Sequence, residues 1–251
     1  MDPYKEKNAE SWYSITEQLV KSHPLAPLIV DLCLKSWQSI LNGKINTYLN
    51  LRIREMRISP QATGALLHDI IPEYVEKQNI KGFRKGIGKE KDIICDYDDT
   101  YSIELKTSSQ DSIYGNRSYA KTESGKEKSG YYVTINFEKI TKKDPEILLI
   151  KMGWLDHTDW HGQARQTGQR ASISKDVWDK KLITLYKLPI NINTADFERL
   201  QTLEGIGPAT AQKIIDHRES NGKYKSVDDL LVVKGIREDI VKYLQDVITF
   251  C

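Results

Sequence analysis

The sequence predicts a mixed α/β domain followed by a small all-α domain. Apolar residues recur at helical spacing up to about residue 78, short β-rich runs replace that pattern between residues 92 and 186, and helical spacing with Gly-containing turns returns after residue 190. A chain of 251 residues has room for one medium and one small domain. We therefore expect two domains, residues 1–188 and residues 189–251.

Three helices are expected before the strands begin. Residues 10–41 have helical apolar spacing, but Pro24 and Pro27 interrupt it, which predicts two helices rather than one. A further helix is expected from Pro60 to about residue 78, with Pro72 as an early-turn or kink residue. These helices would flank the sheet that the following strands form.

Five β-rich runs follow the helices. DIICD (92–96) and YSIELKT (101–107) are typical of a hairpin, with the turn at Tyr97-Asp98-Asp99-Thr100. The further strands are expected at 130–137, 146–154 and 182–186, with a polar stretch at 154–174 between the last two. Helices followed by a cluster of strands indicate an α/β domain.

Composition is that of a folded globular protein, with 39% hydrophobic and 29% charged residues. No apolar run approaches the roughly 20 residues that span a bilayer, and the N-terminal residues form no apolar signal region. Cys33, Cys95 and Cys251 are too few and too scattered for a disulfide framework, so we expect reduced thiols. These features predict a cytoplasmic protein. The net charge is only +2, so binding to nucleic acid would depend on local patches.

The C-terminal segment contains an internal repeat. LEGIGPATAQKI (203–214) joins an apolar helix end to a new helix through a turn with Gly205 and Gly207, and DLLVVKGIREDIVKYL (229–244) repeats the plan with Gly235. Glycines let the backbone approach a phosphate closely, and the next helix start presents free N–H groups. This repeat resembles the tandem helix-hairpin-helix domain, which in its family grips the backbone of duplex DNA.

The second hairpin departs from that pattern, because Arg237 stands in place of its second glycine. From Ile190 onward ten acidic residues outnumber eight basic ones, a net charge of −2. Binding would therefore depend on the hairpin amides, assisted by Lys213, Lys234 and Arg237. A compact helical tail used for dimerisation is the alternative interpretation.

Carboxylates beside a lysine at a strand edge are the candidate catalytic group. Phosphodiester hydrolysis needs an activated water and neutralised phosphate charge, which Mg²⁺ held by carboxylates can supply. Asp92 opens one expected strand, and Glu104 and Lys106 share one face of the next. Asp92 joins that face only if the connecting loop has an odd number of residues or carries a bulge. Alone, the triplet Glu104-Leu105-Lys106 is weak evidence for a nuclease, since charged residues often alternate in this way on a solvent-exposed strand.

The D-x11-E-x-K pattern resembles the PD-(D/E)xK nuclease motif, with Lys91 in place of its proline. The resemblance implies a restriction-endonuclease-like mixed sheet flanked by helices, with Lys106 orienting or helping to deprotonate the attacking water. It also implies that Glu73, on the preceding helix, is a candidate further ligand, although a surface glutamate is an equal alternative. The Mg²⁺ ligands that it implies are Asp92, Glu104 and the carbonyl of Leu105.

Longer stretches are more specific and resemble type II restriction endonucleases of the ScaI family. The likeness covers about residues 10–187 and implies a homodimer that cuts both strands of a short palindromic site, leaving 5′-phosphates and 3′-hydroxyls. A cognate DNA methyltransferase would belong to the same system. The stretches are GALLHDIIPEYV (64–75), KDIICDYDDTYSIELKTSS (91–109), YGNRSYAK (114–121), KSGYYVTINFEK (128–139) and MGWLDHTDWHGQARQTGQRA (152–171).

Side chains able to read bases cluster after the catalytic strand. Arg can bind guanine and Asn or Gln can bind adenine through paired hydrogen bonds, although each could equally contact a phosphate. The candidates are Asn116, Arg117, Gln163, Arg165, Gln166, Gln169 and Arg170. His157 and His161, with Asp156 and Asp159 nearby, could also suggest a zinc site, but such spacing recurs by chance.

The sequence therefore predicts a type II restriction endonuclease that uses Mg²⁺ and binds double-stranded DNA. A structure-specific repair nuclease is the second interpretation, because paired hairpins also follow the nuclease domain of the XPF type. Those proteins have Glu-Arg-Lys where this chain has Glu104-Leu105-Lys106, which favours restriction. A non-catalytic DNA-binding protein is the third.

Overall fold

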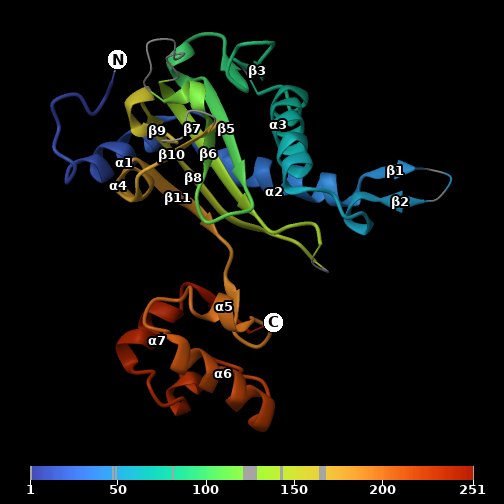
Figure 1. Ribbon diagram of the computed structural model, residues 1–251, viewed down its shortest axis with the longest axis vertical. Coiled ribbons are helices and arrows are strands. Elements are labelled where there is room, and N and C mark those ends of the chain that lie inside the picture. Colours follow the sequence, from blue (N-terminus) through green and yellow to red (C-terminus); the bar gives the residue numbers. More distant parts are fainter. Residues whose placement is uncertain are drawn as a thin grey trace. The chain divides into compact units, whose positions relative to one another are not determined.

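The computed structural model describes residues 2–46, 48, 50–80, 82–120, 129–141, 144–163 and 168–250. The chain divides into two compact units, Met1–Tyr186 and Lys187–Cys251, which are called unit 1 and unit 2 below (Figure 1). Each has its own hydrophobic core, so each is described by itself.

The three predicted helices of unit 1 are confirmed. They are α1 (Trp12–Ser22), α2 (Ala26–Asn42) and α3 (Pro60–Lys77). The helical conformation is interrupted between α1 and α2, in the segment that contains Pro24, as expected. At the start of α3, the Ser59 side chain accepts a hydrogen bond from the Ala62 amide, and Pro60 occupies the first turn, where its missing N–H costs nothing. The helix continues through Pro72 to Lys77.

The central sheet of unit 1 contains the predicted strands and one more. Its order is β11-β8-β7-β5-β4-β3, with β5 and β7 parallel and the β3–β4, β4–β5 and β7–β8 pairs antiparallel. The mixed α/β class is thereby confirmed. The strands are β3 (Phe83–Lys85), β4 (Ile93–Cys95), β5 (Ile103–Ser108), β7 (Gly130–Phe137), β8 (Ile147–Leu155) and β11 (Leu182–Lys187).

Both faces of this sheet are covered, which explains why β7 is buried along its whole length. Alternate residues of a strand point to opposite faces. On β7, Tyr131 and Val133 belong to the core formed with the three helices, whereas Tyr132 belongs to a second, smaller core on the other face. On β5, Ile103 and Leu105 likewise point toward the helices, which leaves Glu104 and Lys106 on the face of the smaller core.

A three-stranded antiparallel sheet in order β6-β10-β9 contributes Trp160 and Ala171 to that smaller core and was not predicted. Its strands are short and largely exposed, so they lack the apolar alternation that identifies a strand in sequence. Its elements are β6 (Tyr114–Asn116), β9 (Trp160–Gly162) and β10 (Arg170–Ile173), with short 3-10 turns η3 (Arg117–Tyr119) and η4 (His157–Asp159) and the helix α4 (Lys175–Lys180).

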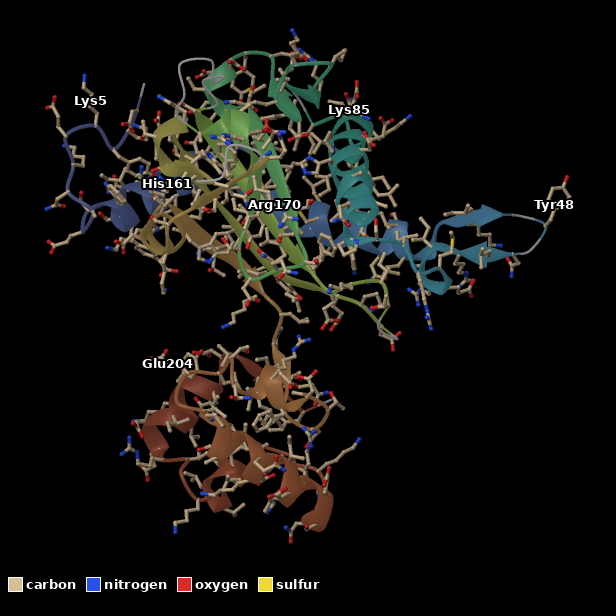
Figure 2. All side chains as sticks on the ribbon, in the orientation of Figure 1. Lys5, Tyr48, Lys85, His161, Arg170 and Glu204 are labelled. Carbon is tan, nitrogen blue, oxygen red and sulfur yellow. The ribbon has the colours of Figure 1, made fainter. Side chains whose placement is uncertain are left out.

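A second unpredicted element is the hairpin of β1 (Lys44–Asn46) and β2 (Leu51–Arg52), which projects from unit 1 beside the end of α2 (Figure 1). Tyr48, which is 98% exposed, stands at its tip (Figure 2). Two further 3-10 turns complete unit 1, η1 (Ile53–Glu55) and η2 (Asp99–Tyr101).

Unit 2 is helical, as predicted, and a small pair of strands joins its two ends. Ile190 pairs with Ile248 and Asn191 with Thr249, in parallel. The helices are short and separated by tight turns. The elements are β12 (Ile190–Asn191), α5 (Phe197–Leu200), α6 (Pro208–Asn221), η5 (Asp228–Val232), α7 (Glu238–Leu244) and β13 (Ile248–Thr249).

Two remaining expectations concern cysteines and membranes. Cys33 and Cys95 are free and buried, while Cys251 lies outside the described residues. Among the residues that the structure describes, no helix has the length and apolar character required to cross a membrane.

Candidate active site

Asp92 lies where strands β4 and β5 diverge. The strands pair at Ile93 and Ile103, and the odd number of residues between these two places Asp92 in register with Glu104. Strand β4 begins at Ile93, so it offers no strand partner to the Leu105 amide. Asp92 Oδ2 accepts a hydrogen bond from this amide at 2.6 Å and thus satisfies a backbone donor that would otherwise be unpaired. The loop-length condition stated from the sequence is therefore met.

Glu104 and Lys106 form a buried ion pair on β5. Their exposed fractions are only 5% and 7%. Lys106 Nζ donates to Glu104 Oε1 at 2.8 Å and to the Leu105 carbonyl at 3.0 Å. A buried pair needs further hydrogen bonds to offset its desolvation. Tyr119 provides them, because its hydroxyl donates to Glu104 Oε1 and accepts from Lys106 Nζ at 3.0 Å.

Both carboxylates, Glu104 and Asp92, affect the pKa of Tyr119. Burial raises the pKa of the Tyr119 hydroxyl far above its usual range, and the charge of Glu104 raises it further, with a smaller effect from Asp92. Burial and then Glu104 also raise the pKa of Tyr132. The Tyr119 hydroxyl therefore keeps its proton and acts as a donor, and the charges of both Asp92 and Glu104 act upon it.

Helix α3 approaches this site through His68, which sequence reasoning missed. His68 Nδ1 lies 3.1 Å from Asp92 Oδ1. The expected helix residue, Glu73, instead pairs with Lys77 at 3.6 Å and with Lys85 at 3.8 Å. Glu73 points away from Asp92 because it lies five residues after His68. Five residues make about one and two-fifths helical turns, so the two side chains project in different directions. These contacts do not support Glu73 as a ligand.

The donors at the site suit a hard divalent cation. Two carboxylates, from Asp92 and Glu104, and the main-chain carbonyl of Leu105 are oxygen ligands of the kind that Mg²⁺ prefers. The ammonium of Lys106 already contacts two of these three groups, so the oxygens lie where a positive charge is favourable. The residues present therefore fit Mg²⁺ in the chemistry of their donors.

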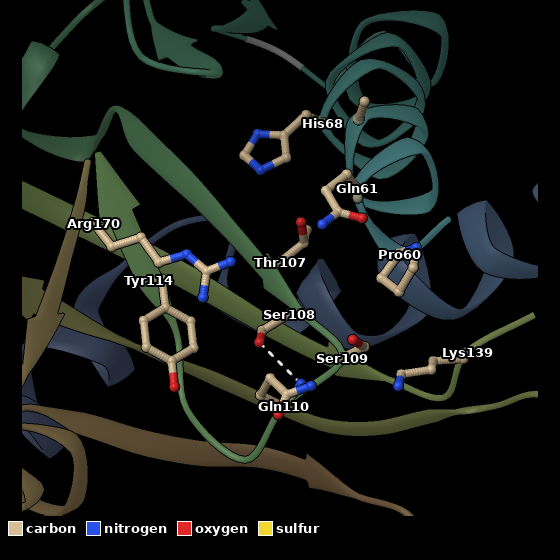
Figure 3. Close-up of a pocket in the computed structure, with 12 residues that line it drawn as sticks. Pro60, Gln61, His68, Thr107, Ser108, Ser109, Gln110, Tyr114, Lys139 and Arg170 are labelled. Atoms are coloured by element: carbon tan, nitrogen blue, oxygen red, sulfur yellow. Dashed lines mark hydrogen bonds between the residues drawn. The ribbon is translucent and has the colours of Figure 1, made fainter. Parts of the chain in front are cut away.

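A polar cavity of about 630 Å³ is lined in part by His68, the residue that contacts Asp92 (Figure 3). Its helical wall comes from one stripe of α3, at i, i+3, i+4 and i+7, and includes Gln61 and His68. Its floor follows the end of β5, directly after Lys106. Only Arg170 of this set was predicted as a functional residue. The lining residues are Pro60, Gln61, Gly64, Ala65, His68, Thr107, Ser108, Ser109, Gln110, Tyr114, Lys139 and Arg170.

The candidate DNA-reading residues gather on the three-stranded sheet. Asn116 is opposite Arg170 in the β6–β10 register. The Arg117 amide donates to the Gln169 carbonyl at 2.8 Å, and the Gln163 amide donates to the Arg170 carbonyl at 3.1 Å. These five residues, which come from two distant segments of the sequence, thus lie together at this sheet, and Arg170 also lines the cavity. Arg165 and Gln166 lie outside the described residues.

The structure does not support a zinc site at the His157–His161 pair. His157 Nδ1 lies 3.0 Å from Asp156 Oδ1, and Asp156 also accepts a hydrogen bond from Ser129. Asp159 pairs with the buried Lys181 at 2.7 Å. Within the described parts of the chain, no three or more His, Cys, Asp and Glu side chains form a metal-binding group. The acidic residues here have structural partners.

In unit 2 each hairpin packs on the other repeat. Gly205 and Gly235 both have positive φ, +81° and +118°. A Cβ at Gly205 would lie 3.1 Å from Ile240 on α7, and one at Gly235 would lie 3.1 Å from Thr210 on α6. Thr210 and Ile240 are 30 residues apart, like the two glycines, so the contacts are reciprocal. Glycine is required at both positions for conformation and for space.

The two hairpins differ at their helix starts. Gly207 caps α6, and a side chain there would meet open space. Arg237 caps α7, whose first turn contains Glu238 and Asp239, and its guanidinium lies 3.4 Å from Asp239 Oδ2. A hollow of about 430 Å³ lies beside Gly205, Gly235 and Arg237. Lys213 and Lys234 are the two lysines predicted to assist DNA binding. Lys213 Nζ donates a hydrogen bond to the Lys234 main-chain carbonyl at 3.1 Å.

Comparisons with known proteins agree with this division. Residues 2–186 match the ScaI restriction endonuclease family, and residues 186–249 match the helix-hairpin-helix motif. The type II restriction enzyme ScaI of Streptomyces caespitosus is 38% identical over 192 residues, which are 73% of this chain and 84% of that protein. The class is therefore that of the site-specific deoxyribonucleases. Within that class, the chain belongs to the ScaI restriction endonuclease family. The resemblances to this family and to the helix-hairpin-helix domain are confirmed.

Two shorter matches cover other kinds of protein. ComE operon protein 1 of Bacillus subtilis is 42% identical over 60 residues, 24% of this chain and 29% of that protein. The Endonuclease/exonuclease/phosphatase family domain-containing protein 1 of Homo sapiens is 47% identical over 47 residues, 19% of this chain and 8% of that protein. Such short matches carry no argument about the activity of this chain.

Proposed function

We propose that this restriction endonuclease is of the PD-(D/E)xK type and hydrolyses double-stranded DNA at a short palindromic site with Mg²⁺, leaving 5′-phosphates and 3′-hydroxyls. The observation that carries the proposal is the convergence of Asp92, Glu104, the Leu105 carbonyl and Lys106 at the β4–β5 fork. Other parts of unit 1 would position the DNA against this group.

Each catalytic residue has a role that its contacts support. Asp92, Glu104 and the Leu105 carbonyl would hold Mg²⁺, which when bound makes a water more acidic and neutralises phosphate charge. Lys106 would orient the attacking water and help to deprotonate it, and its fixed positive charge would stabilise the phosphate in the transition state. His68 would fix the direction of the Asp92 carboxylate, as hydrogen-bonded partners of metal ligands commonly do.

The two domains would share DNA binding unequally. Residues 1–188 would form the endonuclease domain, in which Asn116, Arg117, Gln163, Gln169 and Arg170 contact bases or phosphates. Residues 189–251 would form the DNA-binding domain, in which the amides after the hairpin glycines contact phosphates. A palindromic site has twofold symmetry, so a homodimer would present one active site to each strand. A cognate DNA methyltransferase and a cytoplasmic location remain predictions from the sequence.

Cleavage of plasmid DNA tests the proposal directly. Incubation with Mg²⁺ should give discrete fragments, EDTA should prevent them, and sequencing of the ends should show one repeated palindrome with 5′-phosphates. Glu104→Ala provides the matched control, because it removes one carboxylate of the proposed metal site. Cutting that is confined to branched DNA, or that persists in EDTA, would contradict the proposal.

A further inference from the structure

We propose that Tyr119 is a positioning residue that couples the DNA-reading turn η3 to the catalytic pair Glu104 and Lys106. The inference rests on the function proposed above and deepens it. Tyr119 is the third residue of η3, and η3 follows directly on β6. The four residues from Asn116 to Tyr119 thus include two candidate DNA-reading residues, Asn116 and Arg117, and the side chain that reaches the active site.

The catalytic end of this connection consists of three contacts made by one side chain. The Tyr119 hydroxyl donates to Glu104 Oε1 and accepts from Lys106 Nζ at 3.0 Å. The Lys106 ammonium also lies over the Tyr119 ring, 4.5 Å from its centroid, at a distance typical of cation–π attraction. A shift of Tyr119 therefore changes the surroundings of a proposed metal ligand and of the proposed catalytic lysine together.

The ring of Tyr119 is half-buried and packs against the smaller core, which links its position to that of η3. Its ring centroid lies 5.3 Å from the ring centroid of Trp160 on β9. The backbone of β6 rests directly on both rings, because a Cβ at Gly115 would lie 3.0 Å from Trp160 and 3.2 Å from Tyr119. Groups in such close contact transmit a displacement of one to the others.

The DNA-reading end is attached to the same turn. Asn116 Oδ1 accepts a hydrogen bond from the Ser118 amide at 3.0 Å and so caps η3. The Arg117 side chain donates to the Gly168 carbonyl at 3.3 Å, and its amide donates to the Gln169 carbonyl at 2.8 Å. Contact of Asn116 or Arg117 with a base edge would shift the turn, and Tyr119 follows these residues by three and two positions. Correct reading would thereby set the geometry of Glu104 and Lys106.

Tyr132 offers a matched control. It is also a tyrosine near Lys106, with its ring centroid 5.9 Å from Nζ, and its pKa is raised by burial and by Glu104. It comes from β7 rather than from η3, however, so it has no direct chain connection to the reading residues. Tyr132→Phe and Tyr119→Phe are thus the same chemical change in two tyrosines whose rings lie near Lys106, and only Tyr119 belongs to η3.

The test is a double-mutant cycle with Arg117→Ala. Single-turnover cleavage of the protein's own site is measured at saturating protein and Mg²⁺, so that losses of affinity do not contribute. We expect Arg117→Ala to slow cleavage at least tenfold in the wild-type and Tyr132→Phe backgrounds. In the Tyr119→Phe background, which is itself slow, it should slow cleavage less than about threefold. Effects of Arg117→Ala that are equal in the three backgrounds, or absent in all, would overturn the coupling.

A second readout does not depend on cutting. Coupling between two ligands is reciprocal, so a cation at the site should tighten the binding of correctly read DNA. We would use Ca²⁺, which also takes oxygen ligands, and measure fluorescence anisotropy of a duplex with a non-hydrolysable linkage at the scissile position. Ca²⁺ should tighten binding of this duplex at least fivefold more than binding of a scrambled duplex. Tyr119→Phe should abolish that difference and Tyr132→Phe should preserve it; a difference that survives in Tyr119→Phe would contradict the proposal.

The two proposals fail in different ways. Absence of cleavage by the wild-type protein with any divalent cation would remove the proposed active site and the coupling with it. Cleavage at one site, together with additive effects of Arg117→Ala and Tyr119→Phe, would leave the nuclease intact and remove only the role of Tyr119.

Discussion

The two units differ in the kind of group on which their proposed functions depend. In unit 1 the proposed chemistry depends on charged side chains that are buried and hydrogen-bonded to one another, Glu104 and Lys106 above all. In unit 2 the proposed DNA contacts depend on main-chain turns, and in the described part of that unit no charged side chain is buried. The difference indicates that unit 1 should be sensitive to changes of charge, whereas unit 2 should be sensitive to changes of backbone conformation.

The largest effect is expected from removing one member of the buried pair. Glu104→Gln keeps the shape of the side chain but removes the charge that pairs with Lys106, and Lys106→Ala removes the ammonium. Each should lower the cleavage rate by at least about a thousandfold, because fixed charges in a site of low dielectric stabilise the transition state strongly. DNA binding by anisotropy should fall less than about threefold.

The thermal unfolding of both variants provides the control for this prediction. Leaving one charge of a buried pair without its partner destabilises a protein by about 3–5 kcal/mol. A loss of cleavage accompanied by complete unfolding would therefore say nothing in favour of catalysis, and cleavage at the wild-type rate by a folded variant would exclude the assignment.

Acid should destabilise unit 1 through His23. Burial lowers the pKa of His23 to about 4, against 6.5 in the unfolded chain, and only its hydrogen bond with the Tyr101 carbonyl acts in the other direction. The unfolded state therefore binds the proton first, so the stability is complete above about pH 6.5 and is lost as pH falls toward 4. The loss should reach about 3 kcal/mol.

Denaturant unfolding at several pH values measures this loss. His23→Gln should flatten the dependence between pH 6.5 and 4, since glutamine cannot take up a proton there. An unchanged pH dependence in that variant would assign the acid sensitivity to other groups.

An intermediate effect is expected at His68. His68→Ala removes the side chain that lies 3.1 Å from Asp92 Oδ1, which should raise the Mg²⁺ concentration required for half-maximal cleavage about 10- to 100-fold. Glu73→Gln, on the same helix but paired with lysines, should leave that concentration unchanged. Equal effects of the two substitutions would show that α3 contributes only general charge.

The smallest effects are expected in unit 2 and should follow backbone geometry rather than charge. Gly205→Ala places a Cβ at φ +81° and 3.1 Å from Ile240, so it should destabilise the unit by about 1–2 kcal/mol and weaken DNA binding severalfold. Gly207→Ala, where a side chain meets open space, should leave stability nearly unchanged. Calorimetric unfolding and anisotropy measure the pair, and equal destabilisation by both would contradict the argument.

Sequence periodicity was sufficient for unit 2, because its information is local. The repeat of Gly205 at Gly235, with buried apolar residues at the same spacing, predicts two equivalent turns within one short segment. Even there, the contact of Gly205 with Ile240 and of Gly235 with Thr210 joins the two repeats and could not be read from either one alone.

In unit 1 the sequence by itself determined the three helices, the strands of the central sheet other than β3, and the shared face of Glu104 and Lys106, since side chains in a strand alternate with a period of two. It left open whether Asp92 joins them, because the answer depends on how β4 is registered against β5. Only the tertiary structure decided that His68 rather than Glu73 reaches Asp92, and that Tyr119 reaches Glu104. Those contacts join separate elements, and their geometry is set by packing that no local pattern records.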